Sequence, residues 1–381
     1  MKPLVLAALS LAIGCGSSTD ATKTQGAPPT TTTCAAAPYQ DRGPYVVGVT
    51  TMSIDGGVPV EVWYPADVGA EAGKTRAKYD MRDWLPAASR AKISDADAPL
   101  HEMDAYRDVA MSSATAGKKF PLALFSHGLG GYRDQTSFLM THLASWGFVV
   151  VAPDHPERGL AIVLAGDLSK IDTSKGPDQM RAALAMMKGE NEKPGGRFAA
   201  KLDLAHVAAI GHSMGGGTVA TISADPEISA SVLLASPGFG TLADKPLMMM
   251  WGAADGVAKP STIEPSFDKQ ASGKRGVAIK DAGHMAFTDL CVIGRDKGGV
   301  LQIAIDHGLA VDDLVKQLAS DGCGNQKGGA PYLGPELGWP VIDHFVTAEL
   351  RAALRIDVTP IGLDDAAVKC FGDRVAKFRS E

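Results

Sequence analysis

The sequence has no cluster of lysine and arginine, no C-x-x-C pair, no group of neighbouring cysteines and histidines, and no internal repeat. Its formal net charge is −6 at pH 7, so nothing in its charge favours a polyanion, and we predict no nucleic-acid partner. Because structural zinc sites need clustered thiolates or imidazoles, we also predict no metal site. The 45% of hydrophobic residues suffices for a sizeable core and argues against general disorder.

Long apolar runs are also missing, except at the start of the chain. Residues 1–15, MKPLVLAALSLAIGC, combine one basic residue with an apolar run that ends in small residues before Cys15. This pattern is typical of a secretory signal, and the run is too short to span a bilayer. The last five of these residues resemble a bacterial lipobox, with Ala12 where leucine is usual. We therefore expect lipidation of Cys15, with ordinary signal cleavage nearby as the alternative.

Residues 16–38 have too little apolar surface to fold, and we predict a disordered polar tether before a single domain at 39–381. The chain has five cysteines, and lipidation of Cys15 would leave four, an even number that suits disulfides. Three pairings are open, of which we favour Cys291–Cys323 and Cys34–Cys370.

The signal and its cysteine also predict where the protein acts. We expect export and anchoring at the bacterial cell envelope, in the outer membrane or the periplasm, with membrane contact only through the lipid on Cys15. Secretion without an anchor is the alternative.

From residue 120 onward, short apolar runs alternate with helix-like segments, which predicts strands buried on both faces of a parallel sheet. The predicted strands are 120–126, 147–152, 206–211, 230–235, 246–252 and 275–280, and the predicted helices are 134–146, 178–190, 214–224 and 339–354. Upstream, two β-like runs at 45–49 and 58–64 flank a turn and predict a hairpin. The predicted fold class is α/β: a mostly parallel central sheet with an N-terminal antiparallel hairpin and helices on both faces.

Two connecting segments are less defined. The polar stretch 66–117 shows little periodicity and is expected to run over the surface. The segment 155–200 is rich in glycine, lysine and methionine, and could form either a partial lid or a solvated connection with one surface helix.

The motif Gly211-His212-Ser213-Met214-Gly215 lies between a predicted strand and a predicted helix, which is the context of a G-x-S-x-G nucleophile elbow. The two glycines permit a turn that is too tight for a Cβ. The turn would expose Ser213 at the N-terminus of the next helix, where free N–H groups favour negative charge. We predict that Ser213 is a nucleophile, with a chance match in a glycine-rich chain as the alternative.

A serine hydroxyl needs a base, and the base needs a third group to hold it. Of the three histidines after Ser213, His284 follows the predicted strand 275–280, and loops at the carboxyl ends of parallel strands deliver side chains to such sites. His307 and His344 fall in helix-like stretches and are interpreted as structural. We predict that His284 is the general base.

For the acid, Asp255 follows the predicted strand 246–252 and lies between small residues. Asp244 precedes the same strand and therefore lies at the wrong edge of the sheet. Asp281 and Asp289 are close to the predicted base in sequence and are expected to support it. We predict that Asp255 orients the base.

Attack on a carbonyl group creates an oxyanion, which needs hydrogen-bond donors already in place. One candidate donor is the N–H of Met214, and the other is that of Leu129 in the glycine-rich loop after the strand 120–126. His127 in this loop and His212 beside the serine are expected to support the backbone rather than to act as bases.

At these residues the chain resembles the plasma-type platelet-activating factor acetylhydrolase family. It is similar also to bacterial cutinases and polyester hydrolases and to predicted dienelactone hydrolases. The resemblance covers roughly residues 43–355 and is carried by SHGLGGYR at 126–133, SWGFVVVA at 145–152 and GHSMGGG at 211–217. It implies an α/β-hydrolase fold without a metal or organic cofactor. It also implies the same site: catalytic Ser213, Asp255 and His284, with oxyanion donors at Leu129 and Met214.

True dienelactone hydrolases use a cysteine nucleophile, so Ser213 counts against that substrate. The segment 291–335 does not match the family and could reshape the substrate cleft. The sequence thus predicts a monomeric esterase or lipase that hydrolyses small-molecule, lipid or polymer esters through an acyl-enzyme. The alternatives are an acyltransferase, a thioesterase or an amidase with the same residues, and a surface lipoprotein whose fold serves only binding.

Overall fold

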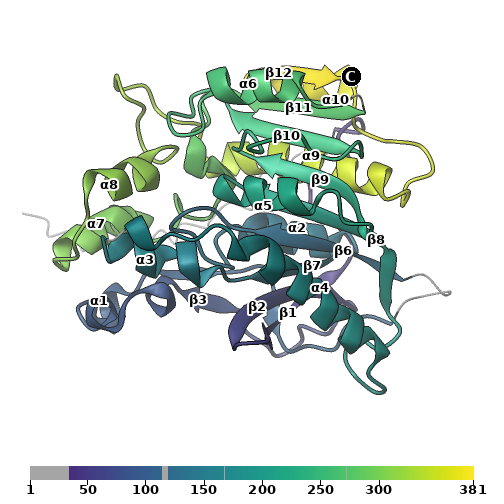
Figure 1. Cartoon of the computed structure of the whole chain (residues 1–381), viewed down its shortest axis with the longest axis horizontal. Coiled ribbons are helices and arrows are strands. Elements are labelled where there is room, and N and C mark those ends of the chain that lie inside the picture. The colour runs from purple at the N-terminus through teal and green to yellow at the C-terminus, as the bar shows by residue number, and fades with distance from the viewer. Residues whose placement is uncertain (1–33, 114–118, 167, 272) are drawn as a thin grey trace, which may run out of the picture. The chain divides into compact units, whose positions relative to one another are not determined.

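A ten-stranded sheet dominates the computed structural model, which describes residues 34–113, 119–166, 168–271 and 273–381 (Figure 1). The predicted signal, Cys15 and the tether up to residue 33 lie outside the described residues. In chain order the strands of this sheet are β1 (Val46–Ile54), β2 (Val58–Ala66), β5 (Tyr106–Arg107), β6 (Phe120–Ser126), β7 (Val149–Pro153), β8 (Leu202–His212), β9 (Ile228–Leu234), β10 (Leu247–Gly252), β11 (Lys274–Ile279) and β12 (Val375–Ser380).

The order of strands across the sheet is β12-β11-β10-β9-β8-β6-β7-β2-β1-β5. The strands from β7 across to β11 run parallel to one another. At one side β1 and β2 form an antiparallel hairpin, and β2 is antiparallel to β7. The predicted parallel sheet and N-terminal hairpin are therefore confirmed. The antiparallel edge strand β12 was not predicted, because its polar sequence pairs with a single neighbour, β11.

Helices cover both faces of the sheet, because side chains along each buried strand alternate between the two faces. In β6, Ala123 and Phe125 belong to the core layer that contains α2 and α9, whereas Leu122 and Leu124 belong to the layer that contains α4, α5 and α6. The helices are α1 (Ala87–Arg90), α2 (Ser137–Ser145), α3 (Leu160–Leu164), α4 (Lys175–Glu192), α5 (Met214–Ile222), α6 (Pro260–Asp268), α7 (Gly299–Asp306), α8 (Asp313–Ser320), α9 (Pro335–Ala353) and α10 (Asp365–Cys370).

The two undefined connections take up structure of their own. Within 66–117, β3 (Lys78–Asp80) and β4 (Leu100–Glu102) form a small antiparallel sheet. Within 155–200, α4 packs against β6 and β7 and so covers the main sheet rather than the site. The short helix α3 belongs to the same segment and precedes α4 in the chain.

Two disulfides are present, and they join the pairs that we favoured, Cys34–Cys370 and Cys291–Cys323. Ala37 is fully buried, so the chain is already part of the fold at residues 34–38, and the predicted tether ends before them. The disulfide to Cys370 explains this earlier start, because it fixes Cys34 to the end of α10. Among the described residues, no helix is long and apolar enough to cross a membrane.

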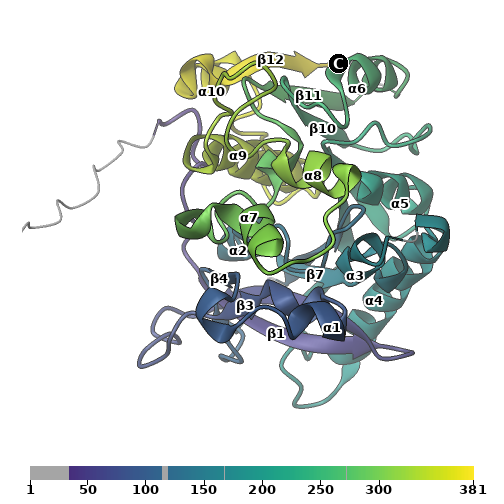
Figure 2. The same cartoon turned by 90° about the vertical axis from the view of Figure 1, so that its left-hand side faces the viewer.

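The segment 291–335 forms a helical pair. Helices α7 and α8 contact each other, and α8 also contacts the short 3-10 helix His284–Phe287. Figure 2 shows α7 and α8 together on the side of the molecule where α1 and α3 also lie. This segment therefore stands next to the loop that carries the predicted base.

Candidate active site

Ser213 lies at the sharp turn between β8 and α5. Its backbone has φ 53° and ψ −121°, a strained conformation that residues other than glycine rarely adopt. A Cβ at Gly211 would overlap the carbonyl group of Gly215, and a Cβ at Gly215 would overlap the carbonyl oxygen of Ser126. The turn that presents Ser213 thus requires both flanking glycines.

The imidazole of His284 lies between Ser213 and Asp255. Its Nε2 is 2.9 Å from Oγ of Ser213, although the two residues are 71 positions apart, and its Nδ1 is 2.9 Å from Oδ2 of Asp255. In the neutral ring, Nδ1–H donates to the carboxylate, and Nε2 can accept from the serine hydroxyl. The structure therefore brings together the three residues that the sequence singles out.

The loop after β10 holds the carboxylate of Asp255 in place. Its Oδ1 accepts hydrogen bonds from the backbone N–H groups of Val257 and Ala258, at 2.8 and 2.7 Å. Since Oδ1 is occupied by its own loop, Oδ2 is left to orient His284.

A second carboxyl group, that of Asp321 after α8, supports the same pair of loops. Its Oδ1 accepts from the backbone N–H of His284 at 2.6 Å, and its Oδ2 accepts from that of Gly256 at 2.9 Å. Burial raises the pKa of Asp321, as does the nearby charge of Asp255. No motif marks Asp321 in the sequence; the only signal is its place two residues before Cys323, in the segment that could not be matched.

The glycine-rich loop after β6 runs directly beside the serine, because a Cβ on Gly128 would lie 3.0 Å from the Cβ of Ser213. Arg158 braces this loop: its guanidinium donates to the carbonyl oxygen of His127 at 2.8 Å, and its own carbonyl accepts from Gly130 at 2.8 Å.

The two predicted oxyanion donors lie near Ser213, Met214 as the next residue in the chain and Leu129 in the loop that runs beside the serine. Met214 is the first residue of α5, and Leu129 follows Gly128 in the braced loop. Within the described part of the chain, neither backbone N–H donates to an acceptor. Both groups are therefore available to a bound ligand.

His127 and His212 act as supports, as predicted. Nδ1–H of His127 donates to the carbonyl of Gly128, and Nε2 accepts from the backbone N–H of His155 at 2.9 Å. His212 accepts from the amide of Gln135 and lies 3.3 Å from the carbonyl oxygen of His284. Burial lowers the pKa of each imidazole to about 3, so both rings are neutral at physiological pH.

The remaining candidates lie elsewhere. Asp281 and Asp289 do not support His284, contrary to expectation: Asp281 is exposed, and Asp289 accepts from the backbone N–H groups of Ser137 and Phe138 at the start of α2. Asp321 takes the supporting position instead. His307 follows α7 and His344 is buried in α9, and each is bonded to a backbone carbonyl.

Across the described residues, no group of three or more histidine, cysteine, aspartate or glutamate side chains could hold a metal ion. The groups that the structure brings together around Ser213 are its hydroxyl, the imidazole of His284 and the carboxylate of Asp255.

Two comparisons with known proteins point to the same family. Residues 35–193 match the family model for platelet-activating factor acetylhydrolase, isoform II. Over 249 residues the chain is 26% identical to the platelet-activating factor acetylhydrolase of Cavia porcellus. The aligned residues make up 54% of this chain and 57% of that protein. The chain thus spans little more than half the length of this relative. With the observed sheet order and nucleophile turn, the chain has the α/β-hydrolase fold, and it resembles the platelet-activating factor acetylhydrolases.

Proposed function

We propose that this chain is a serine hydrolase of carboxylic esters that works through an acyl-enzyme on Ser213. The observation that carries the proposal is the line of hydrogen bonds from Ser213 through His284 to Asp255. The free N–H groups of Leu129 and Met214 beside this line complete what acyl transfer requires.

In the first step, His284 Nε2 takes the proton of the Ser213 hydroxyl as Oγ attacks the ester carbonyl carbon. The carbonyl oxygen becomes an oxyanion, which accepts hydrogen bonds from the N–H groups of Leu129 and Met214; one such donor lowers the barrier by about 2.7–4 kcal/mol. Asp255 stabilises the imidazolium. The bond from the carbonyl carbon to the alkoxy oxygen then breaks, and the alcohol leaves with the proton from His284.

In the second step, water takes the place of the alcohol. His284 removes a proton from the water as it attacks the acyl-enzyme, and the same two N–H groups hold the second oxyanion. The bond to Ser213 Oγ breaks, the serine recovers its proton from His284, and the carboxylic acid is released.

The matched family and the relative from Cavia porcellus favour lipid esters within this class. The relative's name states that it removes an acetyl group from platelet-activating factor. We propose that substrates of this chain are uncharged or weakly polar esters, with a lipid or polymer ester as the natural choice.

We further propose that the protein works outside the cytoplasm as a monomer, anchored through a lipid on Cys15. The two disulfides support export, since disulfides persist in oxidising compartments. Fractionation of cells that express the full chain or Cys15→Ser tests the anchor. The wild-type chain should stay with membranes, and the variant should be released into the soluble fraction.

Labelling with a fluorophosphonate, followed by peptide mapping, tests the catalytic proposal directly. The wild-type chain should be modified at Ser213, and Ser213→Ala should not react. Matched ester, thioester and anilide substrates then identify the bond, and ester cleavage should be fastest. Absence of labelling together with absence of turnover would refute the proposed function.

A further inference from the structure

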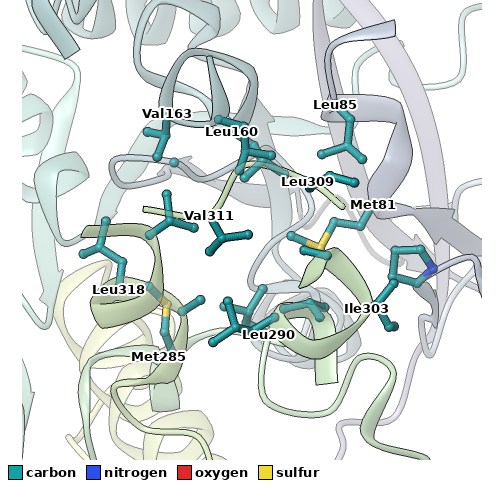
Figure 3. A pocket seen from close by; sticks show the side chains of 18 of the residues that line it. Met81, Leu85, Leu160, Val163, Met285, Leu290, Ile303, Leu309, Val311 and Leu318 are labelled. Carbon is teal, nitrogen blue, oxygen red and sulfur yellow. The ribbon is translucent and has the colours of Figure 1, made fainter. Parts of the chain in front are cut away.

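A second feature adjoins the site: a pocket of about 770 Å³, counting the part that opens to solvent, whose lining residues have no polar side chain (Figure 3). Its walls come from five separate parts of the chain. The residues are Met81, Leu85, Ile93, Pro99, Leu129, Gly130, Leu160, Val163, Leu164, Met285, Leu290, Val300, Leu301, Ile303, Ala304, Leu309, Val311, Val315, Leu318 and Ala319. In the close-up, the labelled side chains, which come from four of these parts, converge on one space.

The lining of the pocket includes two residues that neighbour the reactive groups, although neither Ser213 nor His284 belongs to it. Leu129, whose N–H is one of the two free donors, contributes to the wall, and Met285 directly follows His284. We infer that the wall formed by Leu129 and Met285 is the side of the pocket that faces the reactive groups.

The segment 291–335 builds one side of the pocket through α7 and α8. Both helices lie outside residues 35–193, which match the family model. The Cys291–Cys323 disulfide closes this segment on itself, and the hydrogen bond from the backbone N–H of His284 to Asp321 ties it to the site. The apolar space is thus a structural feature of this chain, held firmly against its reactive groups.

We propose that this pocket binds the aliphatic chain of the ester substrate, so that the natural substrates carry an unbranched hydrocarbon chain rather than only an acetyl-sized group. This inference rests on the proposed ester hydrolysis. The absence of any charged or polar lining side chain excludes charged and sugar-like groups from this pocket, because burial of a polar group without a partner is costly. An aliphatic chain is the group whose transfer into such a space is favourable.

The chain can belong to the acyl part or to the alcohol part of the ester, and two substrate series separate these sources. In p-nitrophenyl esters from acetate to dodecanoate, only the acyl chain changes. In acetate esters of alcohols from ethanol to dodecanol, only the alcohol changes. In the series that varies the part of the ester bound in the pocket, kcat/KM should rise with chain length, by up to about fourfold for each methylene that becomes buried. The rise should level off once the pocket is full.

A bulky side chain in the pocket should abolish this dependence. Ala304 lines the pocket from α7, and Ala304→Phe should lower the ratio of octanoate to acetate turnover at least tenfold. The matched control is Ile305→Phe, which adds an aromatic ring at the neighbouring position of the same helix; Ile305 is 47% exposed and does not line the pocket. The control should keep the wild-type ratio.

Thermal unfolding should be measured for each variant, and Ala319→Phe on α8 replaces Ala304→Phe if the latter does not fold. A wild-type protein that hydrolyses acetate esters but shows no chain-length dependence in either series would overturn the pocket assignment and leave the proposed function intact. A protein that cleaves no ester and is not labelled at Ser213 would overturn both.

Discussion

The carboxylate of Asp321 accepts a 2.6 Å hydrogen bond from the backbone N–H of His284, and this bond ties the helical segment 291–335 to the loop of the proposed base. The other oxygen of the same carboxylate accepts from Gly256, next to Asp255. One side chain therefore sets the relative position of the two loops whose side chains must meet. Its role is to position the base, since it contacts the backbone of His284 rather than the reacting atoms.

We predict that Asp321→Asn lowers kcat for ester hydrolysis by about 10- to 100-fold and changes KM little. The amide has one acceptor oxygen and so can satisfy only one of the two N–H groups, and a hydrogen bond to a charged group contributes about 1.5–3 kcal/mol. Steady-state kinetics over a range of pH checks this, because a displaced base should also change the pH profile. Asp313→Asn on the exposed face of α8 is the control, and equal kinetics for the two variants would contradict the positioning role.

The line of hydrogen bonds from Ser213 through His284 to Asp255 predicts that substitutions of Ser213 and of Asp255 lower kcat by different amounts. Ser213→Ala should lower kcat by about 10⁶-fold, because it removes the nucleophile. Asp255→Asn should lower kcat by about 10⁴-fold, because the amide favours the wrong tautomer of His284 while it preserves the packing. Measurement of kcat for both variants and for the double variant checks this. If the two fold-losses in kcat multiplied in the double variant, the residues would not act as one unit.

The parallel sheet could be predicted from the sequence because its strands are buried on both faces and read as continuous apolar runs, such as FPLALFS at Phe120–Ser126. The strand Val375–Ser380 could not, since an edge strand exposes polar side chains and forms only by pairing with β11. Short-range patterns thus determine the centre of the fold better than its edge.

The same division holds for the site. Ser213, His284 and Asp255 each follow a strand in a loop with small residues, so the order of strands alone brings them to one rim. Asp321 lies far in the sequence from any strand of the main sheet. Its position in space depends on how α8 packs and on the Cys291–Cys323 disulfide. Apart from Cys323, nothing within a few residues of Asp321 encodes that arrangement, and Asp281 and Asp289 were the wrong choices for the same reason.

The two disulfides should differ in their effect on catalysis. Replacement of Cys291 and Cys323 by serine should lower the free energy of unfolding by about 3–4 kcal/mol, given the separation of 32 residues, and should also lower kcat because Asp321 loses its anchor. The matched control, serine at Cys34 and Cys370, should lower stability without changing kcat of the folded enzyme. Denaturant titration and kinetics measure the two quantities, and equal effects on kcat would contradict the prediction.

The buried imidazole of His127 should make the fold less stable in acid. Burial, helped by the positive charge of Arg158, lowers its pKa from the ordinary 6.5 to about 3. Between these values the unfolded chain binds a proton that the folded protein excludes, so stability decreases as the pH falls below about 6.5, by up to about 1.4 kcal/mol per pH unit. This stability is present at neutral pH and is fully lost only near pH 3.

Substitution of the same residue isolates this contribution from other titrating groups. Burial raises the pKa of Asp289 and of Asp321, and these carboxyl groups act in the opposite sense, so the absolute pH dependence of stability is a sum of several terms. In His127→Gln, the dependence on pH between 4 and 6 should be weaker than in the wild type by about 1.4 kcal/mol per pH unit, because glutamine does not titrate. Denaturant titrations at several pH values measure both slopes. Equal slopes would mean that the imidazole of His127 takes up its proton in the folded state, and that its hydrogen bond from His155 does not keep Nε2 unprotonated.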